Sequence, residues 1–160
     1  RSATARLLDS ACREFGAFYL KGHGIDTMNM LDRIRSFFSI SSEEKQRIAI
    51  GSGGFTRGYI GMGEESGSES LEVKEAFSYG FPWAEDKSSD NSMQGPNVWP
   101  SSLVIQEGWR QHMEDFFSRM VSVAEGLVRA FSLSYGYDEN HLSGYCSRGD
   151  TISEIGRAHV

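Results

Sequence analysis

The sequence predicts a helix-rich α+β domain with one long helix and a few short strands. Apolar residues recur every three or four positions in several segments, and the longest of these covers residues 102–135. Short apolar runs near residues 17–20 and 70–81 indicate strands. With 160 residues, 39% of them hydrophobic and 24% charged, the chain can bury a core and is too apolar to be disordered.

Charge and composition exclude several classes of protein. The net charge of -6 argues against a general nucleic-acid binder, which would carry a basic face. No apolar run approaches the roughly 20 residues of a membrane helix, and no signal peptide is visible, so we expect a cytoplasmic protein without a membrane partner. Cys12 and Cys146 leave a disulfide open, but two free thiols in a reducing compartment are the preferred interpretation.

The first quarter of the chain predicts three helices and one strand. Residues 4–15 form an amphipathic helix whose apolar side would carry Leu7, Leu8, Ala11, Cys12 and Phe15. The run 17–20 follows as a strand, and the glycines of 22–24 turn the chain sharply. Asp26 or Thr27 caps a second helix that extends to Phe38, and Ser41 caps a brief third one.

Residues 51–70 are rich in glycine and serine and predict a loop. A phosphate-binding loop is the functional alternative, but the glycines do not fall as GxxxxGK[ST]. Glu64 and Glu65 would also repel a phosphate. We therefore expect an extended loop that is packed by Phe55, Tyr59 and Ile60, followed by a strand at 70–81.

A long helix dominates the second half. Ser101 or Ser102 would cap it, the apolar stripe continues to Tyr135, and Gly136 would stop it. Such a helix would be roughly 50 Å long at ~1.5 Å per residue. A stripe of this length needs a partner surface that the few predicted strands do not supply. A short last helix is predicted at 140–145.

No catalytic set and no metal site follow from the residues. The nearest approach to a facial triad is His112-x-Glu114 with His141, but residues two apart on a helix point ~200° away from each other. His23 is best explained as a turn histidine that is bonded to nearby backbone. Gly-x-Ser-x-Gly is absent, and neither cysteine has a basic neighbour in a plausible nucleophile turn.

Six short motifs nevertheless occur in the order typical of one enzyme family. They are residues 11–19 (ACREFGAFY), 22–25 (GHGI), 41–45 (SSEEK), 57–59 (RGY), 74–77 (KEAF) and 96–100 (PNVWP). By these motifs the chain resembles the amino-terminal domain of the non-haem Fe(II)/2-oxoglutarate-dependent oxygenases, the isopenicillin N synthase-like superfamily. The resemblance covers nearly all of residues 4–150.

The resemblance implies an oxidoreductase parent that hydroxylates, desaturates or ring-closes a small molecule with Fe(II) and 2-oxoglutarate. Relatives that use Fe(II) and O₂ without 2-oxoglutarate are also known, and this sequence does not separate the two cases. The His-x-Asp…His and Arg-x-Ser motifs of the family's jelly roll do not occur here. We therefore expect the helix-rich amino-terminal portion with the jelly-roll core largely absent, inactive by itself, with the missing carboxy-terminal jelly-roll half as its partner.

The same resemblance suggests Arg57 and Tyr59 as substrate-binding residues, because this region shapes one wall of the substrate pocket in relatives. A solvated Arg57 and an anchoring Tyr59 are the structural alternative. Residues 4–153 would form the domain, and 154–160 resemble a translated sequencing adaptor rather than natural sequence. The rival function is a non-enzymatic interaction module that docks on a partner protein by the 102–135 helix.

Overall fold

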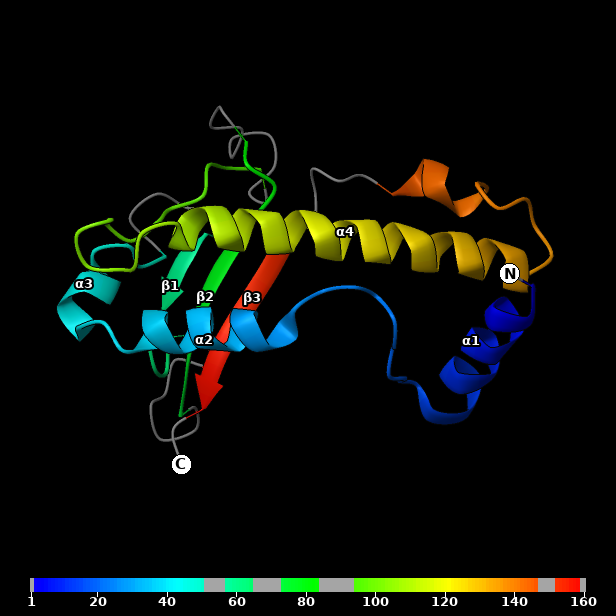
Figure 1. Cartoon of the computed structure of the whole chain (residues 1–160), viewed down its shortest axis with the longest axis horizontal. Coiled ribbons are helices and arrows are strands. Elements are labelled where there is room, and N and C mark those ends of the chain that lie inside the picture. The colour runs from blue at the N-terminus through cyan, green and yellow to red at the C-terminus, as the bar shows by residue number, and fades with distance from the viewer. Residues whose placement is uncertain (1, 51–56, 65–72, 84–93, 147–151, 159–160) are drawn as a thin grey trace. The chain divides into compact units, whose positions relative to one another are not determined.

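The computed structural model describes residues 2–50, 57–64, 73–83, 94–146 and 152–158 (Figure 1). The elements follow the chain as α1 (Ser2–Phe15), α2 (Thr27–Phe38), α3 (Ser42–Gln46), β1 (Gly58–Ile60), β2 (Lys74–Gly80), α4 (Trp109–Ser134), the 3₁₀ helix η1 (Leu142–Tyr145) and β3 (Ile152–Ala158). The predicted helix-rich α+β class with one long helix is confirmed. Two compact units are present, one made of Arg1–Asp26 with Phe116–Ser147 and one of Thr27–Asp115 with Arg148–Val160.

The three predicted amino-terminal helices are present with nearly the expected bounds. Ser41 caps α3 as predicted, since its Oγ accepts a hydrogen bond from the Glu44 backbone N–H at 3.3 Å. The predicted apolar side of α1 is only partly right. Ala5 and Leu8 are buried, whereas Leu7 and Phe15 are exposed. Residues three apart share a helix face, so a face that buries Ala5 and Leu8 turns Leu7 away.

The predicted strand at 17–20 is wrong for this structure. These residues are extended but belong to no sheet, and Tyr19 is 99% exposed. A strand requires a neighbour for its backbone hydrogen bonds, and no described segment of the chain pairs with this one. The turn that follows does use glycines with positive φ, at Gly22 and Gly24.

The long helix is real but shorter than predicted. It begins at Trp109 rather than at residue 101 or 102 and contains 26 residues, or roughly 39 Å. Residues 101–108 form turns instead, because Gly108 has a φ of 73° and interrupts any helical path. The predicted stop is confirmed: Gly136 has a φ of 80°, and the Tyr137 N–H donates to the Ser132 carbonyl at 3.0 Å.

The second unit contains an antiparallel sheet in the order β1-β2-β3. The strand predicted at 70–81 is confirmed at Lys74–Gly80, while residues 70–72 lie outside the described part. The sequence missed β1, because its three residues stand inside a glycine-rich segment. It assigned no element to 152–158, which pair with β2 from Lys74↔Ala158 to Gly80↔Ile152.

An aromatic core fills this unit. Phe37 of α2 and Phe77 of β2 have ring centroids 4.7 Å apart, and Trp109 of α4 stacks on Phe37 at 5.5 Å. Trp99 contacts both Phe77 and Trp109, at 5.8 and 6.0 Å. The Trp109 indole N–H donates to the Arg33 carbonyl at 2.9 Å, so this buried polar group is satisfied.

Within the described residues, no helix combines the length and hydropathy needed to cross a bilayer. Cys12 and Cys146 are both free thiols, as the sequence favoured.

Gly58 is predicted to tolerate no side chain. A Cβ there would stand 2.3 Å from the Ile48 carbonyl oxygen, and its φ is 125°. We expect Gly58→Ala to lower the free energy of unfolding in urea by about 2–4 kcal/mol. The matched control is Gly108→Ala, which also has positive φ but open space around its Cβ, and should cost only about 1–2 kcal/mol. Equal losses in the two variants would show that the backbone contact at Gly58 has no effect.

Candidate functional site

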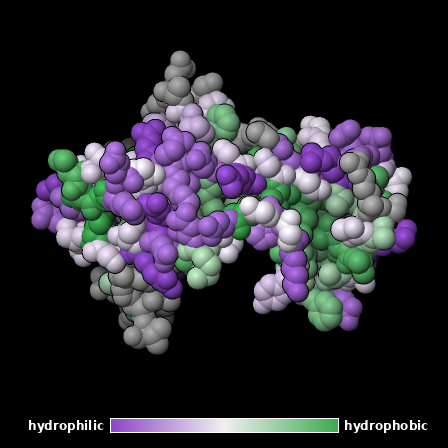
Figure 2. Space-filling model, viewed as in Figure 1, coloured by the Kyte–Doolittle hydropathy of each residue, from purple (hydrophilic) through white to green (hydrophobic). Residues whose placement is uncertain are grey.

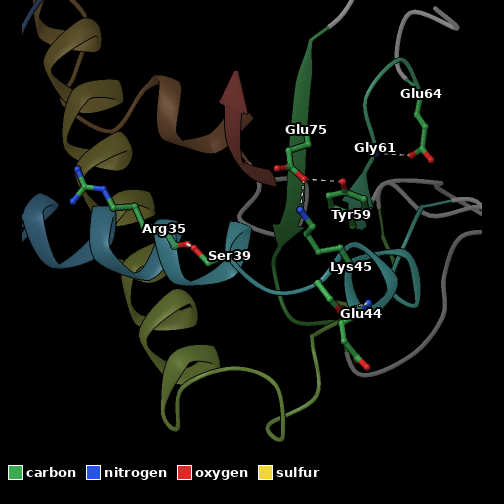
Figure 3. A network of polar contacts seen from close by, with 9 residues as sticks. Arg35, Ser39, Glu44, Lys45, Tyr59, Gly61, Glu64 and Glu75 are labelled. Atoms are coloured by element: carbon green, nitrogen blue, oxygen red, sulfur yellow. Dashed lines mark hydrogen bonds and ion pairs between the residues drawn. The ribbon is translucent and has the colours of Figure 1, made fainter. Parts of the chain in front are cut away.

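Three polar side chains meet inside the second unit, from three different elements (Figure 3). Glu75 of β2 accepts at Oε2 from Lys45 Nζ of α3 at 2.6 Å and from the Tyr59 hydroxyl of β1 at 2.7 Å. The side chains of Lys45 and Glu75 are only 4% and 2% exposed. We call Lys45, Tyr59 and Glu75 the buried triad.

The aromatic surroundings of Lys45 add to this arrangement. Its ammonium lies 5.4 Å from the Tyr59 ring centroid and 6.0 Å from that of Phe38. A cation near an aromatic face is attracted by the ring quadrupole, more so when it is withdrawn from water. Because a buried charge is costly unless it is paired and hydrogen-bonded, removing either Lys45 or Glu75 would leave a lone buried charge.

Backbone hydrogen bonds also hold Tyr59 in place. Its N–H donates to the Ile48 carbonyl and its carbonyl accepts from the Ile50 N–H, both at 2.8 Å. On the other side, Tyr59 pairs with Phe77 of β2. The chain that leaves α3 thus forms an isolated parallel bridge with β1 at Ala49, and this bridge fixes the register of the whole 57–60 segment.

The two residues predicted to bind substrate are neighbours of this network. Tyr59 is buried and its hydroxyl is occupied by Glu75, which is the anchoring role that the sequence analysis kept as the alternative. Arg57 is also buried rather than solvated, at 2% exposure, and burial lowers the pKa of its guanidinium. Arg57 directly precedes β1, and Gly58 with its φ of 125° separates it from Tyr59.

Sequence reasoning missed the roles of Lys45 and Glu75. The sequence pattern that could have indicated them is Glu75, a charged residue next to the apolar pair Ala76 and Phe77 in a predicted strand. Such a residue needs an opposite charge if both faces of the strand are covered. The pairing itself joins residues 30 positions apart and has no local signature.

The described residues form no metal centre. No three His, Cys, Asp or Glu side chains among them gather closely enough to hold an ion. Glu114 accepts from Arg110 at 2.9 Å, and the part-buried His112 Nε2 has no hydrogen-bond partner among the described residues. The ring of His141 stacks on Tyr137 at 4.4 Å. The set of His112, Glu114 and His141 therefore offers no facial triad.

His23 has the structural role that the sequence predicted. Its Nδ1 accepts a hydrogen bond from the Ile25 backbone N–H at 3.2 Å, which closes the turn. An open depression of about 380 Å³ adjoins it in the first unit, lined by His23, Gly24, Ile25, Arg119, Ser122 and Val123. Nothing in the sequence indicated this depression, because its two sides come from distant parts of the chain.

Comparisons with known proteins agree with the motifs. The family described as non-haem dioxygenase in morphine synthesis, N-terminal, matches residues 1–102. The 2-oxoglutarate-dependent dioxygenase caaD of Aspergillus niger is 27% identical over 141 residues, which is 85% of this chain and 43% of that protein. Isopenicillin N synthase of Penicillium rubens is 27% identical over 94% of the chain and 47% of the synthase. A homoarginine-6-hydroxylase of Glycine max is 32% identical over 86% of the chain and 42% of the hydroxylase.

Solved structures share the fold. A full-length Neurospora crassa protein in complex with alpha-KG superposes with a TM-score of 0.81 at 22% identity. The match covers 97% of this chain and 48% of the Neurospora crassa chain. The same protein in complex with alpha-KG and thymine gives a TM-score of 0.81, and 49% of its chain is covered. The chain spans about half the length of the relatives and structures that it matches.

Removing one partner of the ion pair should destabilise the protein strongly. Lys45→Met leaves Glu75 buried without its cation, so we expect a loss of about 3–5 kcal/mol in the free energy of unfolding. The double variant Lys45→Met with Glu75→Gln should lose less than the sum of the two single variants, because it leaves no lone charge. Arg47→Gln is the control, since that exposed cation of the same region pairs at the surface and should change stability by no more than about 1 kcal/mol. If the double variant lost as much free energy of unfolding as the two single variants together, Lys45 and Glu75 would not be coupled.

The hydroxyl of Tyr59 can be tested separately. Tyr59→Phe keeps the ring against Lys45 but removes the donor to Glu75. A hydrogen bond to a charged group contributes about 1.5–3 kcal/mol, so urea unfolding should show a loss of that size. A loss below ~0.5 kcal/mol would mean that the ion pair alone satisfies Glu75.

Proposed function

Because the chain belongs to the amino-terminal family of the non-haem dioxygenases, we propose that it is the amino-terminal half of an Fe(II)/2-oxoglutarate-dependent oxygenase. The whole enzyme would hydroxylate, desaturate or ring-close a small molecule. One observation carries the proposal: nearly the whole chain matches, and it matches only about half of each oxygenase. The named activities of those relatives support the reaction class and do not identify the substrate.

The iron and 2-oxoglutarate do not fit the residues described here. Bound iron and 2-oxoglutarate would supply the oxidising chemistry. No group of His, Cys, Asp or Glu side chains among the described residues could hold a metal ion. We therefore assign the iron and 2-oxoglutarate ligands to the other half of the enzyme and expect this chain to be inactive alone.

Exposed apolar side chains support the proposal that the first unit carries a surface for binding a second domain. Figure 2 shows green, hydrophobic side chains on the surface near α1. Leu7 and Phe15 of α1 are 72% and 73% exposed, and Tyr19 in the extended 17–20 segment is 99% exposed. Backbone groups without a sheet neighbour and apolar side chains without cover are what an interface with a second domain would use. We propose the carboxy-terminal jelly-roll half as that partner, in contact with α1 and the exposed 17–20 segment.

The predicted substrate-binding residues take different parts in this proposal. Arg57 would face an anionic group of the substrate at one wall of the completed pocket. A guanidinium that is withdrawn from water attracts an anion more strongly than an exposed one. Tyr59 of β1, two residues after Arg57, would support Arg57 by anchoring the chain through its bond to Glu75. A cytoplasmic location completes the proposal, and the free thiols of Cys12 and Cys146 support it.

The isolated chain should not bind Fe(II) tightly. We expect anaerobic calorimetric titration of Fe(II) into the 160-residue chain to show no stoichiometric binding, because the described residues hold no ligand cluster. Stoichiometric micromolar binding that His112→Ala abolishes would contradict this and would place a metal site on α4. The control is the same titration into Arg110→Gln, which changes charge on α4 but removes no metal ligand.

The natural transcript tests the function directly. We expect the reading frame to continue past residue 153 into strands that carry His-x-Asp, a distal His and Arg-x-Ser. The same sequence would show whether residues 154–160, which contribute most of β3, are natural or an added tail after a 4–153 domain. A natural stop near residue 153 would refute the oxygenase half and favour the interaction module that docks by its long helix, now bounded as α4.

A further inference from the structure

The depression beside His23 has the chemistry of a small anion site. We propose that it binds the carboxylate of a small organic acid, a function separate from the oxygenase chemistry proposed above. All the residues that line it belong to one unit, in the 22–25 turn and on α4. Its volume of about 380 Å³ lies in the range of small-molecule sites.

Arg119 is the principal donor of this site. In the part of the chain that the structure describes, its guanidinium makes no hydrogen bond or ion pair, and none of the described lining residues is acidic. Arg119 is exposed on α4, so an anion can reach its guanidinium, whereas Arg13 and Arg110 pair with carboxylates one turn away. The planar fork of a guanidinium matches the two oxygens of a carboxylate.

His23 supplies a second donor, and its orientation is determined by the turn. Because Nδ1 accepts from the Ile25 N–H, that nitrogen carries no proton, and the neutral ring must carry its proton on Nε2. Gly22 and Gly24, with φ of 76° and 71°, allow the tight turn that makes this bond possible. Ser122 adds a polar wall, but its hydroxyl already donates to the Ser118 carbonyl at 3.0 Å.

The apolar lining selects the class of acid. Ile25 and Val123 line the same depression as Arg119. An acid with a short alkyl chain can therefore place its carboxylate on Arg119 and its methylene groups on these side chains. Inorganic phosphate would use the same donors but gain nothing from Ile25 and Val123, so the two anions distinguish a carboxylate site from a general oxyanion site.

The test is a titration of the ¹⁵N-labelled 160-residue chain with butyrate, followed by amide NMR at constant ionic strength. We expect saturable shifts at Gly24, Ile25, Ser122 and Val123, with butyrate binding about three- to tenfold more tightly than acetate. Arg119→Gln should weaken binding by about tenfold or more, and Arg119→Lys, which keeps the charge but not the fork, by less. Arg6→Gln, which removes an arginine outside the depression but in the same unit, should leave the affinity within about twofold.

Three results would overturn the proposal. Shifts that are linear in butyrate or spread over the surface would mean that no site exists. An unchanged affinity in both Arg119 variants would exclude the assigned donor. Binding of inorganic phosphate without binding of butyrate would exclude the carboxylate class. None of these outcomes bears on the oxygenase proposal, which the transcript decides, so failure of one leaves the other intact.

Discussion

The buried ion pair between Lys45 and Glu75 is the constraint on which the second unit depends. It links α3 to β2 across 30 residues of sequence, and Tyr59 brings β1 to the same carboxylate oxygen. Two charges this deeply buried are stable only as a pair, so the elements that carry them cannot separate without exposing or stranding a charge. A buried ion pair adds little to net stability but disfavours other packings of the same elements. We infer that this specificity is the role of Lys45 and Glu75.

The aromatic core and the triad meet on β2 and act on it differently. Phe77 packs with Phe37 and Trp109, which are apolar contacts that tolerate small shifts. Glu75, two residues away, accepts bonds at 2.6 and 2.7 Å that tolerate much less. The core supplies apolar burial, and the triad joins β1 to β2 and α3, while the bridge to Ala49 and the close approach of Gly58 to Ile48 fix the register of β1. Arg57 is the residue before β1, so the register of β1 also determines where Arg57 lies.

The two units differ in how completely they cover their apolar residues. The second buries the aromatic side chains of Phe37, Phe77, Tyr79 and Trp109. The first leaves Leu7, Phe15 and Tyr19 largely exposed, and its 17–20 segment has no sheet neighbour among the described residues. The chain spans about half the length of the relatives that it matches, and five of its exposed large apolar residues lie on α1 and the 17–20 segment: Leu7, Phe15, Phe18, Tyr19 and Leu20.

Local rules were sufficient for much of this protein. Apolar periodicity predicted α1, α2 and α4, the Ser41 cap predicted α3, and Gly136 predicted where the long helix ends, because each depends on residues within one or two turns. The ordered motifs predicted the family. Tertiary structure alone decided that Lys45 pairs with Glu75, that Arg119 lies beside His23, that β1 forms within a glycine-rich segment, and that 17–20 forms no strand. Each of these depends on a partner distant in sequence, and a strand or a buried charge is defined by that partner rather than by its own residues.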